Sequence, residues 1–140
     1  MRARVVPDRD RGFVAIELVL AIGLLLLPVV LLVTALPSWI EREHAASVAA
    51  RDAATAAVAA YPADGRDAAQ VAAFDALADY GIAADDVVIA FDRDDVRRGG
   101  TVAVRVTIRM PALVVPGIGT AGGFHWSVVH TRRIDDYRSA

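Results

Sequence analysis

Residues 13–36 read FVAIELVLAIGLLLLPVVLLVTAL, an apolar run in which Glu17 is the only charged residue. At about 1.5 Å per residue this run gives a helix about 36 Å long, enough to cross a hydrocarbon core of about 30 Å. A carboxylate placed in hydrocarbon costs about 2.5–3.5 kcal/mol on insertion scales, so an ionisable residue here indicates a function and requires a partner. The position of Glu17 therefore raises the question of which cation neutralises it.

The residues around the run predict a single-pass orientation. Basic residues are more frequent before it than just after it, with Arg2, Arg4, Arg9 and Arg11 on one side and Arg42 on the other. The positive-inside rule therefore places the N-terminus in the cytoplasm. Three parts are expected: a cytoplasmic leader over 1–12, a helix through the cytoplasmic membrane over 13–36, and an extracytoplasmic domain over 37–140.

Two other interpretations of the run are open. Val33-Thr34-Ala35 offers the small residues of a signal-peptide cleavage site, and a plain anchor could carry Glu17 incidentally. Against a signal peptide, the run is longer than the usual apolar segment of about 7–15 residues, and Glu17 interrupts its beginning.

The helix is expected to continue beyond the membrane. Pro28 lies in mid-span and lacks a backbone donor, so a kink is expected there, while Trp39 suits the headgroup interface. Residues 41–61 contain no Gly or Pro and are rich in alanine, the best helix former. Because small side chains allow close approach, this part is expected to pack under a sheet or against neighbouring helices, with a solvated stalk as the alternative.

A second, short helix is predicted after a turn over 62–66. Asp67 and Gln70 have the spacing of a capping box, and Gly81 suits a C-terminal stop. Between them, spacings of three and four residues predict one buried helix face, made of Val71, Phe74, Leu77 and Ala78.

The C-terminal half predicts a small sheet. Strict alternation over 101–110 gives the clearest strand, with flanking strands at 87–91 and 124–133 and a hairpin turn at Arg98-Gly99-Gly100. In the last strand one face carries Phe124, Trp126 and Val128, and the other carries His125, Ser127 and Val129. The fold class is therefore α+β: a transmembrane helix extended into an alanine-rich helix, a short second helix, and a three-stranded antiparallel sheet packed on helix.

The connection over 112–123 is apolar and rich in glycine. It forms a candidate contact loop, because contiguous exposed apolar surface marks contact sites. A partner subunit, a membrane surface and the protein's own alanine-rich helix are the alternatives for what it contacts. The residues concerned are Leu113, Val114, Val115, Pro116 and Ile118.

Composition argues against several classes of function. The chain has 140 residues, no cysteine and a formal net charge of −2, which excludes disulfides and thiolate metal sites and gives no reason to expect nucleic-acid binding. His125 and His130 differ by an odd number along a strand and so lie on opposite faces. From Asp92, the places where an EF-hand needs Gly and Glu hold Arg97 and Ala103. No catalytic residues, metal or cofactor are expected, and an enzyme is not favoured.

The junction Arg11-Gly12-Phe13-Val14-Ala15-Ile16-Glu17, with the apolar run starting directly at Phe13, resembles the leader junction of type IV pilins, Flp pilins and pseudopilins. Within that superfamily the chain is most similar to the TadE-like minor pilins or pseudopilins of tight-adherence pilus systems. The resemblance covers residues 11–36. It implies a pilin-like fold and a part in assembling a tight-adherence or type IV-like pilus, or a related secretion apparatus.

The resemblance also implies roles for three residues. A membrane-embedded prepilin peptidase would cut after Gly12 and make Phe13 the new N-terminus, and Glu17 would act in assembly and register. The implied partners are this peptidase, other pilin-like subunits and the pilus assembly machinery. The implied location is the cytoplasmic membrane, followed by an extracellular pilus after assembly.

A physical argument supports the role of Glu17 without the family. Cutting after Gly12 leaves a positive amine at Phe13, one helical turn before Glu17, and this amine or that of a neighbouring subunit can neutralise the carboxylate in a medium of low dielectric constant. The alternative is that Glu17 reaches the cytoplasmic interface, where the first turns of a helix favour a negative charge. The competing hypothesis for the whole chain is an uncleaved, single-pass, membrane-anchored binding or regulatory module acting outside the cell.

Overall fold

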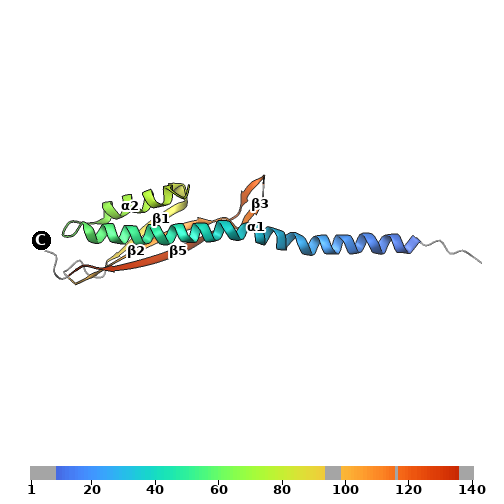
Figure 1. Cartoon of the computed structure of the whole chain (residues 1–140), viewed down its shortest axis with the longest axis horizontal. Helices are drawn as coiled ribbons and strands as arrows, with labels where there is room; N and C mark the ends of the chain where they lie inside the picture. The colour runs from blue at the N-terminus through green and yellow to red at the C-terminus, as the bar shows by residue number, and fades with distance from the viewer. Residues whose placement is uncertain (1–8, 94–98, 116, 136–140) are drawn as a thin grey trace, which may run out of the picture.

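A single long helix runs through most of the structure. The computed structural model describes the backbone of residues 9–93, 99–115 and 117–135, with side chains from Val14 onward apart from Arg93. Helix α1 (Arg9–Ala59) has 51 residues and continues through both Pro28 and Pro37. Its N-terminal half extends away from the other elements, and its C-terminal half lies within a small folded domain (Figure 1). The kink expected at Pro28 stays a prediction.

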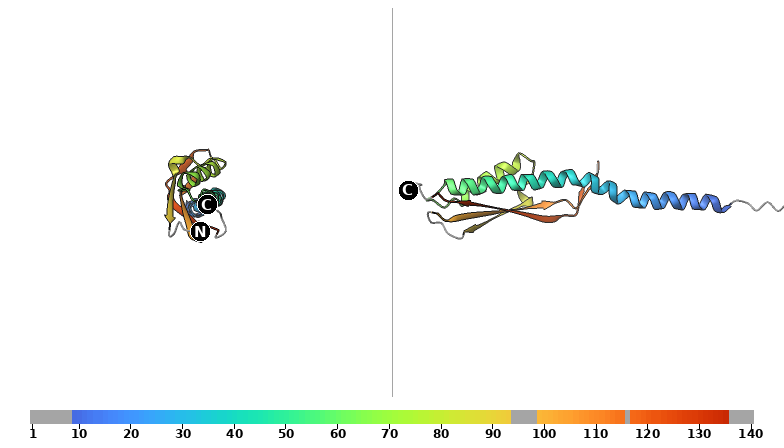
Figure 2. Two further views of the ribbon diagram at one scale, coloured as in Figure 1. Left: turned by 90° about the vertical axis from the view of Figure 1, so that its left-hand side faces the viewer. Right: turned by 60° about the horizontal axis from the view of Figure 1, so that its bottom comes forward.

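The domain has two layers. Helix α2 (Arg66–Ala78) packs beside α1, and a three-stranded antiparallel sheet in the order β1-β2-β5 lies against them. Helix α1 contacts β2 and β5, whereas α2 contacts α1 and β1. Both helices therefore lie on one face of the sheet, as the end-on view in Figure 2 shows. The strands are β1 (Val87–Arg93), β2 (Thr101–Met110) and β5 (Phe124–Arg133), and a short 3-10 helix, η1 (Ala84–Asp86), precedes β1.

The core joins small side chains of α1 to larger aliphatic side chains of β2. Every buried residue of α1 within the domain is an alanine, and these alanines recur at spacings of one, three and four along the helix. The β2 side chains that alternate toward the helix fill the space opposite them. The prediction that the alanine-rich segment packs under a sheet is confirmed, and the solvated-stalk alternative is wrong. The alanines are Ala45, Ala46, Ala49, Ala50, Ala53, Ala54 and Ala57.

The sheet follows the predicted pattern. Strand β2 is buried at every second residue, and β5 begins and ends where the sequence predicts. Phe124 pairs with Met110 and Trp126 with Ile108, so both aromatic residues lie on the helix side of the sheet. They are nevertheless 43% and 42% exposed, because β5 is an edge strand and the alanine-lined helix fills little of the space beside it.

The start of α2 differs from the prediction. The capping box of Asp67 and Gln70 does not form: the helix begins at Arg66, its N-cap is Gly65, and no side chain caps it. The Asp64 carboxylate instead accepts a hydrogen bond from the Arg66 amide at 3.2 Å. A Cβ at Gly65 would lie 2.3 Å from the Ala57 carbonyl oxygen, so close contact between the two helices determines which residue occupies the N-cap.

The buried face of α2 also differs from the prediction. Leu77 is buried as expected and Phe74 packs partly against the core, but Ala78 is exposed and Val71 is 61% exposed. The remaining buried positions are Ala69 and Ala73, whose small side chains suit the close packing of α2 on α1. The C-terminal stop predicted at Gly81 is confirmed.

Gly81 ends α2 in the left-handed conformation, with φ of 66°. Its amide donates to Ala78, and the amide of Ile82 donates to Leu77 at 3.1 Å, which is the Schellman pattern.

The connection over 112–123 is more regular than expected. It contains a two-stranded antiparallel hairpin formed by β3 (Leu113–Val115) and β4 (Gly119–Ala121). The predicted turn at Arg98-Gly99-Gly100 lies partly outside the described residues, which resume at Gly99 with φ of 79°.

The contact between Gly65 and Ala57 gives a first prediction. Serine is at least as good an N-cap as glycine in an isolated helix, so local preference predicts a neutral or stabilising effect for Gly65→Ser. Because the new side chain would meet the α1 backbone, we expect instead a loss of about 1–3 kcal/mol, seen as a lower thermal midpoint of the domain in detergent-solubilised full-length protein.

The matched control is Ala68→Ser, which places the same side chain at an exposed position of α2 and should leave the midpoint nearly unchanged. A Gly65→Ser protein as stable as wild type would show that α1 and α2 do not approach this closely.

Candidate functional site

The N-terminal half of α1 presents an apolar surface that no other described element covers. It is the one described helix long and apolar enough to cross a membrane, with mean hydropathy 2.9 in its most apolar window, of which only 6% is buried. A core helix of a water-soluble protein would be mostly buried, so length, composition and exposure together favour a membrane span. The exposed large side chains include Val14, Ile16, Leu18, Val19, Leu20, Ile22, Leu24, Leu25, Leu26, Leu27, Val29, Val30, Leu32, Val33 and Leu36.

The signal-peptide interpretation gains no support from this half of the helix. Ala35, the residue after which a signal peptidase would cut, is only 2% exposed and lies inside α1. The hydroxyl of the preceding Thr34 lies 3.3 Å from the carbonyl of Val114 in β3, so a hairpin lies against the candidate cleavage site. Cutting there would divide a continuous helix beside a tertiary contact.

Glu17 lies on the exposed apolar half of α1, eight residues after the first helical residue. Within the described part of the chain its carboxylate has no hydrogen-bond or ion-pair partner, and its neighbours are the exposed aliphatic residues of the span. A single copy of the chain therefore supplies no described cation for this carboxylate.

Gly12 and Phe13 lie in the first turn and a half of α1, although their side chains fall outside the described part. Phe13 precedes Glu17 by four residues, and residues at that spacing lie on the same face of a helix. The first turn of a helix has amides without intrahelical acceptors and frays readily, so a bond between Gly12 and Phe13 lies where the helix opens at least cost.

Three side chains of α1 contact backbone carbonyls at the end of the sheet nearest the exposed half of the helix. Trp39 Nε1 donates to Pro111 at 2.6 Å, and Arg42 Nη1 donates to Arg109 at 2.8 Å. The Thr34 hydroxyl is 2.9 Å from the Leu31 carbonyl of its own helix and 3.3 Å from the Val114 carbonyl, so its one proton is shared between the two acceptors. The Trp39 ring also meets Phe124 edge to face, with centroids 5.9 Å apart. These bonds hold the end of β2 and the start of β3 against α1 where its free half begins.

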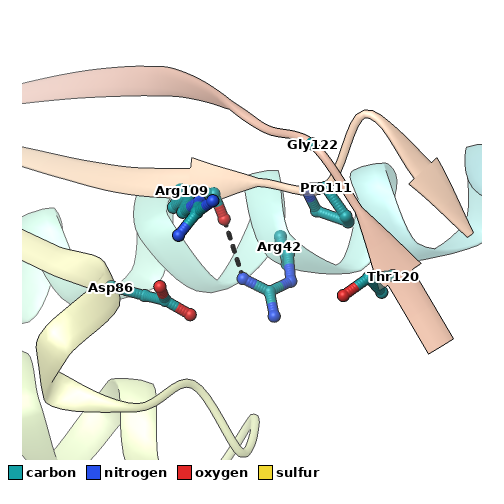
Figure 3. A pocket seen from close by; sticks show the side chains of 6 residues that line it. All are labelled: Arg42, Asp86, Arg109, Pro111, Thr120 and Gly122. Atoms are coloured by element: carbon teal, nitrogen blue, oxygen red, sulfur yellow. Dashed lines mark hydrogen bonds between the residues drawn. The ribbon is translucent and has the colours of Figure 1, made fainter.

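A cavity of about 280 Å³ lies beside these bonds (Figure 3). It occurs where β1 begins: the last β2 residue paired with β1 is Ile108, so the next carbonyl, that of Arg109, is free to accept from Arg42. Asp86 precedes β1 on one side of the cavity, and Thr120 of β4 lies on the other. Its lining residues are Arg42, Asp86, Arg109, Pro111, Thr120 and Gly122.

The candidate contact loop is only partly packed on its own chain. Leu113, Val114 and Val115 are half-buried in β3, which contacts α1. Ile118, by contrast, is 85% exposed beyond the end of β3, and Pro116 lies outside the described residues. Packing on the protein's own helix therefore accounts for β3 but leaves Ile118 largely exposed.

The histidine and aspartate residues do not converge in the described structure. His125 pairs with Arg109 on the outer face of the sheet and His130 pairs with Val104 on the helix face, so the prediction of opposite faces is confirmed. No group of three or more acidic, His or Cys side chains that could hold a metal ion occurs in residues 14–92, 99–115 and 117–135. Asp94 and Asp95 lie outside those residues.

Sequence reasoning missed the cavity and the carbonyl bonds beside it. Trp39 was identifiable only as an interfacial residue and Arg42 only as a flanking charge. Neither pattern contains a signal for a bond to a strand far away in sequence, because the acceptors are backbone carbonyls that every residue has.

Comparison with known proteins identifies no relative. No protein-family model matches the chain, and no curated protein and no solved structure shows significant similarity to it.

The Trp39 bond gives a second prediction. Trp39→Phe keeps an aromatic ring near Phe124 but leaves the carbonyl of the buried Pro111 without its donor, so we expect the domain to lose about 1–3 kcal/mol of unfolding free energy. Hydrogen exchange should also become faster in the amides of β3 and β4. Both quantities can be measured on full-length protein in detergent.

Trp126→Phe is the matched control, since it removes an indole that is 42% exposed and has no hydrogen-bond partner among the described residues. Equal effects of the two substitutions would contradict a structural role for the bond between Trp39 and Pro111.

Proposed function

We propose that this chain is a TadE-like minor pilin or pseudopilin, anchored in the cytoplasmic membrane, that takes part in assembling a tight-adherence or type IV-like pilus or a related secretion apparatus. The observation that carries the proposal is Glu17, a carboxylate on the exposed apolar half of α1 that has no partner in the described chain. The role is structural rather than enzymatic and needs no cofactor.

The proposed mechanism depends on a new charge. A prepilin peptidase cuts between Gly12 and Phe13, which leaves a positive amine about 6 Å along the helix axis from Glu17. Inside the membrane, pairing of the carboxylate with this amine or with that of a neighbouring copy is stronger than in water. Only neighbours at the correct axial height satisfy all charges, so the pair determines the register between subunits.

The architecture of α1 supports a lateral contact between helices. Its N-terminal half is a continuous apolar surface without a described partner, and its C-terminal half is the centre of the folded domain. Because one helix forms both, a subunit held through its first half would also have its domain held in a defined position. An uncleaved membrane-anchored binding module would share the anchor but would need neither the amine nor the register.

The first test is the N-terminus of the mature protein. In a membrane that contains an active prepilin peptidase, intact-mass measurement or N-terminal sequencing should find a chain that begins at Phe13. Substituting Gly12→Leu should block this cleavage, whereas Gly23→Leu, in open space farther along the helix, should not. Persistence of the full-length chain beside active peptidase would refute processing and favour the uncleaved module.

The second test is the charge at Glu17. Glu17→Gln keeps the size of the side chain and removes the charge, so insertion should be unchanged while incorporation into the pilus or its assembly complex falls by about tenfold or more. Recovery from purified membranes measures insertion, and co-isolation with tagged pilin-like subunits measures incorporation.

Glu41→Gln, an exposed carboxylate on the same helix beyond the apolar run, is the matched control and should incorporate normally. Normal incorporation of Glu17→Gln would remove the assembly role assigned to that carboxylate.

A further inference from the structure

The β3–β4 hairpin lies at the level where the apolar half of α1 ends. The Val114 carbonyl lies 3.3 Å from the hydroxyl of Thr34, inside the apolar run, and Val114 pairs with Thr120 across the hairpin. From Val14 to Thr34 the helix rises about 30 Å, which is the thickness of the hydrocarbon core. A span that begins at Val14 therefore places the hairpin at the bilayer surface on the domain side.

The composition of the hairpin suits that surface. Residues 110–123 contain no charged side chain, and Ile118 is 85% exposed beyond the end of β3. Gly117 and Gly119 flank it with φ of 79° and 124°, which L-residues with side chains rarely adopt. In Figure 1 β3 leaves the line of the sheet and projects sideways from α1. An apolar side chain is thus presented beside the membrane helix rather than folded into the core.

The cavity next to the hairpin has the groups that bind a phosphate bearing an amine. Arg42 lies about 9 Å along the helix beyond Leu36, close to the headgroup layer. Arg42, Arg109 and Thr120 line one open space, and Asp86 lies across it from Thr120 (Figure 3). In the described structure no ion pair joins Asp86 to either arginine, so both signs of charge face the cavity.

Gly123 provides the space for the Arg109 side chain. A Cβ at this position would lie 2.8 Å from Arg109 Nε and 3.0 Å from the Met110 carbonyl oxygen. The absence of a side chain at Gly123 therefore leaves room for the Arg109 side chain just before β5 begins.

We propose that the β3–β4 hairpin lies on the bilayer surface and that this cavity binds the headgroup of an amine-bearing phospholipid, such as phosphatidylethanolamine. Arg42, Arg109 and Thr120 donate to the phosphate, and Asp86 accepts from the ammonium group. The occupant is a membrane lipid because the cavity adjoins the membrane helix and is separated from its apolar surface only by an uncharged hairpin. The inference rests on the membrane span of the proposed function.

The position of the hairpin can be measured with single cysteines, since the chain has none of its own. Ile118→Cys, labelled with an environment-sensitive fluorophore in the full-length protein, should show blue-shifted emission in vesicles and quenching by lipids spin-labelled near the headgroup. Ala68→Cys, exposed in α2, is the control for a position in water, and Leu25→Cys is the control for the membrane centre.

The three probes separate two kinds of failure. If Leu25 is reached by deep quenchers while Ile118 behaves like Ala68, the span stands and the hairpin inference is overturned. If Leu25 also reports water, the membrane span of the proposed function is wrong.

The cavity is tested by lipid retention. Full-length protein in nanodiscs of equal phosphatidylethanolamine, phosphatidylglycerol and phosphatidylcholine should, after extraction, retain phosphatidylethanolamine preferentially in native mass spectra. Arg42→Gln with Arg109→Gln should lower that retention about tenfold, as expected for the loss of charge-assisted hydrogen bonds, and Asp86→Asn should abolish the preference over phosphatidylglycerol.

Arg51→Gln, an exposed arginine farther along α1, is the matched control and should retain lipid as wild type does. Equal retention of all three lipids, or retention unchanged by the double substitution, overturns the headgroup site. Displacement of the lipid by millimolar inorganic phosphate would show a general phosphate site and would also overturn it.

Discussion

The fold depends on how closely other elements approach the second half of α1. Every buried side chain on that half within the domain is a methyl group, so α2 and the sheet pack against backbone as much as against side chains. Ala57 and Gly65 are the extreme case, since even one added carbon at Gly65 would enter the α1 backbone. Close packing transmits such a change, because a core at near-crystalline density has few voids to absorb it. Beyond α2, β1 begins opposite Ile108 of β2, and Arg42 of α1 binds the next β2 carbonyl, that of Arg109.

The same helix meets two different surroundings without a break. Large aliphatic side chains cover its first half, where they are exposed, and alanines line its second half, where they are buried. No loop separates the two, and three side chains of α1 bind the backbone around the junction. A domain attached in this way is not a flexible tether on an anchor. Its position follows that of the exposed half of α1, which is the property that the proposed register near Glu17 would need in order to affect the domain.

Helices and strands could be predicted from the sequence where a regular pattern of apolar and polar residues, or a local turn preference, decides which side chains are buried and where the element ends. The alternation in β2, the start and end of β5 and the left-handed Gly81 all follow from local chemistry, and each is confirmed. The prediction failed for α2, where Asp67 and Val71 have good local reasons to be a cap and a core residue. The buried residues of α2 are instead Ala69, Ala73 and Leu77, and its N-cap Gly65 meets the α1 backbone at Ala57, a contact that arises only when the two helices pack together. The cavity was unpredictable for a related reason, since Arg42 binds a main-chain carbonyl that carries no sequence signature. The roles assigned to Gly12, Phe13 and Glu17 stay predictions, because nothing in a single chain supplies the amine or the neighbour.

The charged groups of the two proposals lie at opposite ends of the same apolar surface. Pairing at one end would ease the departure of a subunit from the membrane, whereas headgroup binding at the other end would oppose it. At the end near Glu17, moving the helix out of the membrane costs little electrostatic free energy if a neighbouring subunit supplies the amine that neutralises this carboxylate. At the second end, a headgroup held by Arg42 and Arg109 must be released before the domain can leave the bilayer surface, and the exposed Ile118 loses its apolar surroundings at the same time. Under these two proposals, the free energy of lipid binding is part of the barrier to entering a filament. A subunit that binds its headgroup tightly would stay in the membrane as an assembly platform, whereas one that binds it weakly could become part of the fibre. The balance between these two ends, rather than the presence of Glu17 alone, then decides between a membrane-resident pseudopilin and a minor pilin.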